Sequence, residues 1–267
     1  MPNFFQQVAQ VRDRNQSLLC VGLDTDPLRI PQILQNDPDP VFSFNREIID
    51  ATSDLVCCYK PQIAYYGGAG AEESLVRSIA YAKQKGVPVL LDAKRGDIGS
   101  TAEMYAKEAF QRFNADAVTI NPYMGLDSMK PFLDFAEKGI FILCRTSNPG
   151  GSDLQNLVLA DGKRLYEHVA ELAVTDWNQN DNIALVVGAT RPEEIADIRK
   201  ITGEMTFLLP GVGAQGADIE SLMKSGRGGG MIINSSRGII YASDKRDFVQ
   251  QARAAALDTR DQINQFC

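Results

Sequence analysis

Short runs rich in valine, isoleucine and leucine alternate with longer amphipathic stretches, and this alternation occurs eight times along the 267 residues. Most of the runs are apolar on both faces, as strands are when they lie between a barrel interior and an outer layer of helices. We expect strands at 18–24, 55–61, 87–94, 117–123, 140–146, 183–189, 207–212 and 231–237. A doubly wound open sheet shows the same alternation. Eight units and a length near the roughly 250 residues of a closed barrel favour the (β/α)8 TIM-barrel fold.

The chain is expected to form a single α/β domain over residues 1–267, because no linker or low-complexity tract divides it. Helices are predicted at 72–86 and 191–200, the second opened by a capping box of Thr190 and Glu193. Hydrophobic residues make up 44% of the chain and charged residues 23%, so a large core can be buried. The Gly-rich connection 146–162 is a candidate lid, because loops that follow barrel strands carry function.

The charge and the apolar segments limit the kinds of partner and compartment. The net charge of −7 provides no field that attracts nucleic acid or an anionic membrane. Arg12 and Asp13 precede any apolar stretch, and no apolar run of 18 residues occurs, so neither export nor a membrane span is indicated. The five cysteines include no C-x-x-C, which favours reduced thiols and a cytoplasmic protein. With His168 as the only histidine, zinc-hydrolase and Ser-His-Asp chemistry are disfavoured.

Polar side chains end several of the predicted strands, and in a barrel these ends meet at one mouth. They are Asp24, Lys60, Asp92, Lys94, Asn121, Ser147 and Arg237. Any one of them alone fits a solvated strand end. Asp92 and Lys94 are more informative because they lie two residues apart, so strand alternation points both to one side, where each keeps the other ionised. Asp97 follows a flexible Arg-Gly pair, and it fits either a functional acid or a surface acid before a helix that Ser100 and Glu103 would cap.

A glycine-rich stretch at 210–216 contains a literal G-x-G-x-x-G in Gly211, Gly213 and Gly216. A dinucleotide-binding unit would normally begin a domain, whereas few residues remain after this stretch. In a barrel, the loops after the seventh and eighth strands bind phosphate. We therefore favour a phosphate monoester site, in which Arg237 supplies charge and Gln215 a side-chain donor. Glycines that serve only as turns remain the alternative.

The run from Asp92 to Thr101, DAKRGDIGST, resembles the D-x-K-x-x-D-I-x-x-T motif of the orotidine 5′-phosphate decarboxylase family. The resemblance extends over nearly the whole chain, through LCVGLDTDP, YKPQIAYY, TINPYMGLDSMKPF, TSNPG and PGVGAQG. The Lys-Pro-Gln and Asn-Pro-Tyr-Met-Gly stretches are similar to a subgroup common in bacteria. The chain departs from other branches at Ser236, where they carry glycine before the arginine.

The resemblance implies decarboxylation of orotidine 5′-phosphate to uridine 5′-phosphate by a homodimer that uses neither metal nor organic cofactor. It implies a charged network of Asp92, Lys94 and Asp97, with Lys94 as proton donor. In the family, the motif's second aspartate and its threonine, here Asp97 and Thr101, reach the neighbouring subunit's site. The implied substrate-binding residues are Asp24, Lys60 and Thr101 for the ribose, Ser147 for the pyrimidine, and Pro210, Gly211, Gln215, Ser236 and Arg237 around the phosphate. Lys60 is thereby expected between two acids.

Two other functions fit parts of the pattern. A related barrel that decarboxylates or synthesises keto-sugar phosphates through a Mg²⁺-bound enediolate needs an acidic metal ligand near the second strand, where this chain has Lys60. A non-catalytic phosphometabolite-binding protein would keep Gln215 and Arg237 but has no need for Asp92, Lys94 and Asp97 together. An assay for loss of orotidylate, repeated with EDTA, separates the three.

Overall fold

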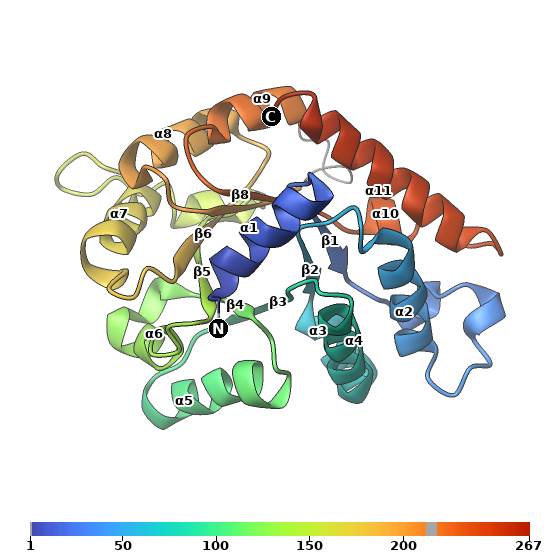
Figure 1. Ribbon diagram of the computed structural model, residues 1–267. Coiled ribbons are helices and arrows are strands. Elements are labelled where there is room, and N and C mark those ends of the chain that lie inside the picture. Colours follow the sequence, from blue (N-terminus) through green and yellow to red (C-terminus); the bar gives the residue numbers. More distant parts are fainter. Residues whose placement is uncertain (1, 212–217) are drawn as a thin grey trace.

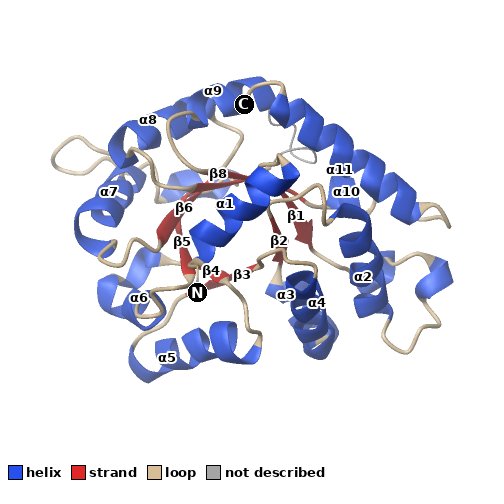
Figure 2. Ribbon diagram, in the orientation of Figure 1, coloured by secondary structure: helices blue, strands red, loops and turns tan. Residues whose placement is uncertain are grey.

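The computed structural model describes residues 2–211 and 218–267 and shows eight parallel strands surrounded by helices (Figures 1 and 2). The strands are β1 Leu19–Leu23, β2 Cys58–Pro61, β3 Leu90–Arg95, β4 Ala117–Ile120, β5 Gly139–Arg145, β6 Ile183–Val187, β7 Phe207–Pro210 and β8 Met231–Ser235. Their hydrogen-bonded order runs β2-β1-β8-β7-β6-β5-β4-β3. Parallel bridges Tyr59–Val89 and Gln62–Asp92 link β2 to β3. The ring confirms the barrel and excludes the open doubly wound sheet.

Helix α1 precedes the first strand, and the other helices follow the strands and surround the barrel (Figure 2). They are α1 Phe4–Asn15, α2 Pro40–Thr52, α3 Ile63–Ala69, α4 Glu72–Gln84, α5 Gly99–Lys107, α6 Leu126–Leu133, α7 Leu165–Leu172, α8 Pro192–Thr202, α9 Ile219–Gly226, α10 Arg237–Ile240 and α11 Phe248–Asn264. Within the described residues, no helix is both long and apolar enough to cross a membrane.

Both predicted capping boxes are wrong. Helix α8 begins at Pro192, whose fixed φ suits the first helical position, so the cap is Arg191 and Thr190 lies one residue too early. Helix α5 begins at Gly99 with Ile98 as its cap, which places Ser100 inside the first turn. Neither cap residue accepts a side-chain hydrogen bond. The predicted strands are also too long, because apolar residues before β2 and β3 belong to the loops that enter the barrel.

The interior of the barrel is packed with side chains, and α1 lies across its amino-terminal end (Figure 1). Phe4 is fully buried and packs edge-on against Phe141 of β5, with ring centroids 5.7 Å apart. Gly139 makes this approach possible, since a Cβ there would lie 2.5 Å from the Phe4 ring. One end of the barrel is therefore plugged, and the charged residues predicted to form the site lie at the other end, where the strands finish.

Candidate active site

Four charged side chains from three neighbouring strands form a row in which acid and ammonium alternate. The Lys60 Nζ atom, on β2, lies 2.9 Å from Asp92 Oδ2 on β3 and 3.9 Å from Oδ1 of Asp24, which follows β1. The Lys94 Nζ atom, farther along β3, lies 2.5 Å from Asp92 Oδ1. Lys60 thus lies between two acids, as expected. We refer to Asp24, Lys60, Asp92 and Lys94 as the charged row.

Burial and neighbouring charges shift the pKa values of Lys60 and Asp92, in the middle of the row, in opposite directions. Burial alone would raise the pKa of Asp92, but the ammonium groups of Lys60 and Lys94 outweigh it and hold that pKa well below its usual range. Burial alone would lower the pKa of Lys60, but Asp92 and Asp24 outweigh it and raise that pKa above its usual range. Both groups are therefore charged near neutral pH.

Lys94 and Asp24, at the two ends of the charged row, each present a group that a ligand can contact. The side chain of Lys94 is 44% exposed, so its ammonium can meet a bound molecule while Asp92 holds it. The Asp24 Oδ1 atom is buried and has no hydrogen-bond partner among the described residues. A buried carboxylate oxygen in that state is poised to accept a hydrogen bond from a ligand hydroxyl.

The end of β3 is irregular, and Thr119 of β4 supports it. Pairing runs from Leu91–Val118 directly to Arg95–Ile120, so three residues of β3 stand opposite Thr119 alone. Lys94 has a φ of +47°, a left-handed conformation uncommon for residues other than glycine. Sequence reasoning missed Thr119 because one threonine within the apolar run AVTI is typical of an ordinary buried strand.

Asp97 and Thr101 do not join the charged row of their own chain. The Asp97 Oδ1 atom accepts a hydrogen bond from the neighbouring Ile98 amide at 2.8 Å. Thr101 is exposed in the first turn of α5. Ile98, Met104 and Tyr123 are large apolar side chains exposed by 58%, 62% and 79% on or near the same segment.

Ser147 lies in the loop after β5, and a buried ion pair anchors the start of this loop. Arg145 Nε lies 2.8 Å from Oε2 of Glu194 on α8, and its Nη1 donates a hydrogen bond to Gln155 Oε1 at 2.9 Å. The same Gln155 oxygen accepts from the Thr146 amide at 2.9 Å. Gly188 leaves room for the loop, since a Cβ there would lie 2.9 Å from the Ser147 nitrogen.

Four of the five residues predicted to surround a phosphate lie directly at the ends of β7 and β8. Pro210 pairs with Asn234 in the sheet, and Gly211 follows with a φ of +122°. Ser236 donates a hydrogen bond to the Gly22 carbonyl at 3.1 Å, and Arg237 is exposed in the adjacent first turn of α10. Gln215, Gly213 and Gly216 lie outside the described residues.

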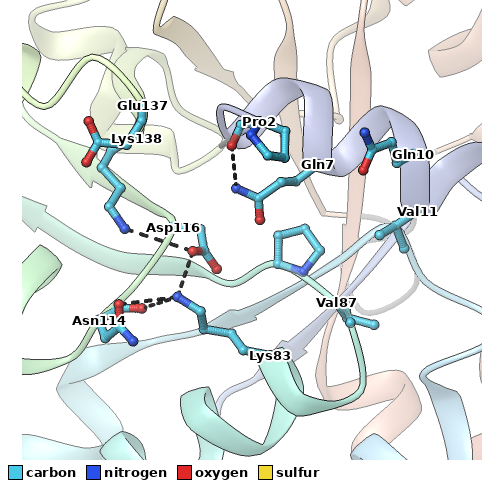
Figure 3. A pocket seen from close by; sticks show the side chains of 12 residues that line it. Pro2, Gln7, Gln10, Val11, Lys83, Val87, Asn114, Asp116, Glu137 and Lys138 are labelled. Atoms are coloured by element: carbon cyan, nitrogen blue, oxygen red, sulfur yellow. Dashed lines mark hydrogen bonds and ion pairs between the residues drawn. The ribbon is translucent and has the colours of Figure 1, made fainter.

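A hollow lies at the opposite end of the barrel, beside α1 and before β3, β4 and β5 (Figure 3). Three of its charged groups bind one another: Lys83 Nζ lies 2.8 Å and Lys138 Nζ 3.9 Å from Asp116 Oδ1. Asp116 Oδ2 also accepts from the Val89 amide at 3.0 Å. This cluster joins the starts of the strands. The charged row, which holds an accessible ammonium against a carboxylate, is the better candidate for stabilising negative charge and donating a proton.

Comparison with known proteins identifies the family of the chain. Residues 17–252 match the model of the "Orotidine 5'-phosphate decarboxylase / HUMPS family". The chain is 59% identical to the orotidine 5′-phosphate decarboxylase of Ralstonia pickettii and 57% identical to that of Azoarcus sp.. The alignments cover 98% and 99%, respectively, of both this chain and the relative. The structure of Leishmania donovani OMP decarboxylase superimposes with a TM-score of 0.84 at 39% identity, covering 99% of this chain and 98% of that one.

Proposed function

The chain belongs to the orotidine 5′-phosphate decarboxylase family and converts orotidine 5′-phosphate to uridine 5′-phosphate and CO2 in pyrimidine biosynthesis; from this premise we propose that Lys94 stabilises the C6 carbanion and then protonates it. The observation that carries the proposal is the position of Lys94, whose ammonium is accessible at the barrel mouth and bound to the Asp92 carboxylate.

The reaction breaks the bond between C6 and the carboxyl carbon, and the electron pair stays on C6 as CO2 leaves. This pair lies in the ring plane, where the π system cannot delocalise it, so an adjacent positive charge must stabilise it. An ammonium 4 Å away contributes about 4 kcal/mol at an effective dielectric constant near 20. Lys94 then transfers one Nζ proton to C6, and solvent restores the proton.

Asp92 has two roles in this mechanism. Its carboxylate holds Lys94 charged and in position, and it lies next to the substrate carboxylate, which it repels. Repulsion in the ground state is relieved as CO2 departs. This repulsion contributes less than the charge stabilisation by Lys94. The ammonium groups of Lys60 and Lys94 lie on either side of Asp92 and offset its negative charge.

The remaining contacts divide the substrate into three parts. Asp24 and Lys60 bind ribose hydroxyls, for which Asp24 Oδ1 is suited because it has no hydrogen-bond partner among the described residues. Ser147 contacts the amide edge of the pyrimidine. The phosphate is bound by Pro210, Gly211, Gln215, Ser236 and Arg237. Phosphate binding is remote from C6, so its energy can close the loop 146–162 over the site and exclude water.

We further propose a homodimer in which Asp97 and Thr101 complete the neighbouring subunit's site. Neither residue joins the charged row of its own chain, and Asp97 lies two residues beyond Arg95, the last residue of β3. Exposed Ile98, Met104 and Tyr123 beside them provide an apolar surface of the kind that pairs with another chain. The enzyme is proposed to be cytoplasmic and to need no cofactor.

The first test is a spectrophotometric assay for loss of orotidine 5′-phosphate, with and without EDTA. Activity that survives EDTA supports the proposal, whereas activity abolished by EDTA and restored by Mg²⁺ contradicts the cofactor-free mechanism. Absence of turnover would instead leave the chain as a phosphometabolite-binding protein.

The second test is Lys94→Ala, which removes both the stabilising charge and the proton. We expect kcat to fall by several orders of magnitude while uridine 5′-phosphate still binds. A purified variant that keeps a tenth of the wild-type kcat would show that Lys94 is not the acid.

A further inference from the structure

Thr119 is a buried hydroxyl at the centre of the irregular end of β3. Its side chain is 0% exposed, and it stands opposite the three residues that the pairing of β3 with β4 skips. This segment carries Asp92 and Lys94, and the left-handed backbone of Lys94 lies within it. Something must hold such a conformation, since residues other than glycine rarely adopt it.

Among the described residues, the side-chain hydrogen bonds of Thr119 all go to this segment. Its Oγ1 atom accepts from the backbone amides of Ala93 and Lys94, each at 2.9 Å. It donates to Asp92 Oδ1, also at 2.9 Å. A hydroxyl has one proton and two lone pairs, so the bonding capacity of Thr119 is used completely.

The same Asp92 oxygen binds the Lys94 ammonium. Thr119 therefore touches Lys94 by two routes: directly at its backbone nitrogen, and through Asp92 at the end of its side chain. Together the two routes fix the beginning and the end of the side chain that delivers the proton.

We propose that Thr119 is a positioning residue for the decarboxylation, which fixes the Lys94 ammonium without touching the substrate. This inference rests on the proposed role of Lys94 as the proton donor. A small displacement of a catalytic group lowers the rate strongly: about 1 Å can cost roughly a hundredfold. Substrate binding depends on the ribose, pyrimidine and phosphate contacts, and Thr119 makes none of them.

The central test is Thr119→Val, which keeps the β-branched shape and removes the hydroxyl. We expect kcat to fall by roughly tenfold to a hundredfold, while the Kd for uridine 5′-phosphate changes by less than about threefold. Thr119→Ser keeps the hydroxyl and should recover kcat to within about threefold of wild type. A purely structural role would not separate kcat from product binding in this way.

Thr202→Val is the matched control. Thr202 is also buried, and its hydroxyl donates to the Ile198 carbonyl at 3.0 Å within α8, away from the charged row. The Thr202→Val variant should keep wild-type kcat within about twofold, although it also loses a buried hydroxyl. If Thr119→Val does not fold, Thr119→Cys replaces it, because a thiol is a weak donor and acceptor, and a loss of at least about tenfold in kcat is expected.

The proposal is overturned if Thr119→Val or Thr119→Cys retains kcat within threefold of wild type, if Thr119→Ser is as impaired as Thr119→Val, or if kcat and product affinity fall together. These outcomes differ from failure of the proposed function. An active Lys94→Ala refutes the role of Lys94, whereas an inactive Lys94→Ala beside a fully active Thr119→Val refutes only the positioning role.

Discussion

At the scale of single residues, the charged row is stable because its buried charges have partners of opposite sign. Lys60 is 4% exposed and Asp92 6% exposed, and an unpaired charge at that depth would be strongly unfavourable. The two-residue spacing of Asp92 and Lys94 predicted that these two pair, whereas the position of Lys60 between two acids was expected from the family resemblance. Thr119 could not be predicted in the same way, since the irregular pairing that gives it a role depends on β4.

The pairing predicts a pH dependence for Asp92→Asn. The folded-state pKa of Asp92 lies below its unfolded value of about 3.9, so its contribution to stability is present above that pH and is lost as the pH falls below it. Asp92→Asn should lower the free energy of unfolding by about 3 kcal/mol at pH 7, and by progressively less below pH 4. Urea denaturation of both proteins from pH 3 to pH 7 measures this. A difference independent of pH would show that the Asp92 charge is not stabilised by its neighbours.

Arg237→Ala tests the phosphate site. An exposed arginine in the turn after β8 is expected to bind the phosphate by charge-assisted hydrogen bonds, which contribute about 1.5–3 kcal/mol. Affinity for uridine 5′-phosphate should therefore fall roughly tenfold to a hundredfold, while affinity for uridine stays unchanged. Calorimetric titration of both ligands compares the losses. Equal losses for nucleotide and nucleoside, or measurable binding of NADH, would reopen the dinucleotide interpretation of the glycine motif.

At the scale of elements, the order of strands and helices was predictable from apolar periodicity, and the ends were not. Helix α8 starts at Pro192, one residue later than a Thr190 cap predicts, whereas α5 starts at Gly99, earlier than a Ser100 cap predicts. Both misplaced caps arise from matching residue types without knowing where the backbone turns. The ion pair that joins α8 to β5 was also missed, because Arg145 and Glu194 are far apart in sequence and each is ordinary in its own segment.

Glu194→Gln should show how much this ion pair stabilises the fold. The change leaves the Arg145 guanidinium, which is 2% exposed, without its carboxylate partner. We expect a loss of about 3–5 kcal/mol in the free energy of unfolding. Asp197→Asn in the same helix removes an exposed pair with Lys200 and should cost less than about 1 kcal/mol. Comparable losses for the two variants in chemical denaturation would show that the buried pair has no special role.

At the scale of the whole molecule, the closed ring explains why residues from distant parts of the sequence meet. The carboxyl ends of β1, β2 and β3 bring Asp24, Lys60 and Asp92 together, and those of β7 and β8 bring Pro210 near Ser236. Closure of the barrel was predictable from the eight repeated units in the sequence. The proposed contribution of a second chain does not follow from periodicity, because Asp97 and Thr101 look like surface residues within a single barrel.

The central claim is that one site takes Lys94 from one chain and Asp97 from the other, and hybrid dimers test it most directly. Inactive Lys94→Ala and inactive Asp97→Ala proteins are unfolded and refolded together in equal amounts, with dimers verified by analytical ultracentrifugation. Each hybrid has one site with both changes and one with neither, so random mixing should restore roughly a quarter of wild-type activity. A well-refolded dimeric mixture that stays inactive would contradict the shared site.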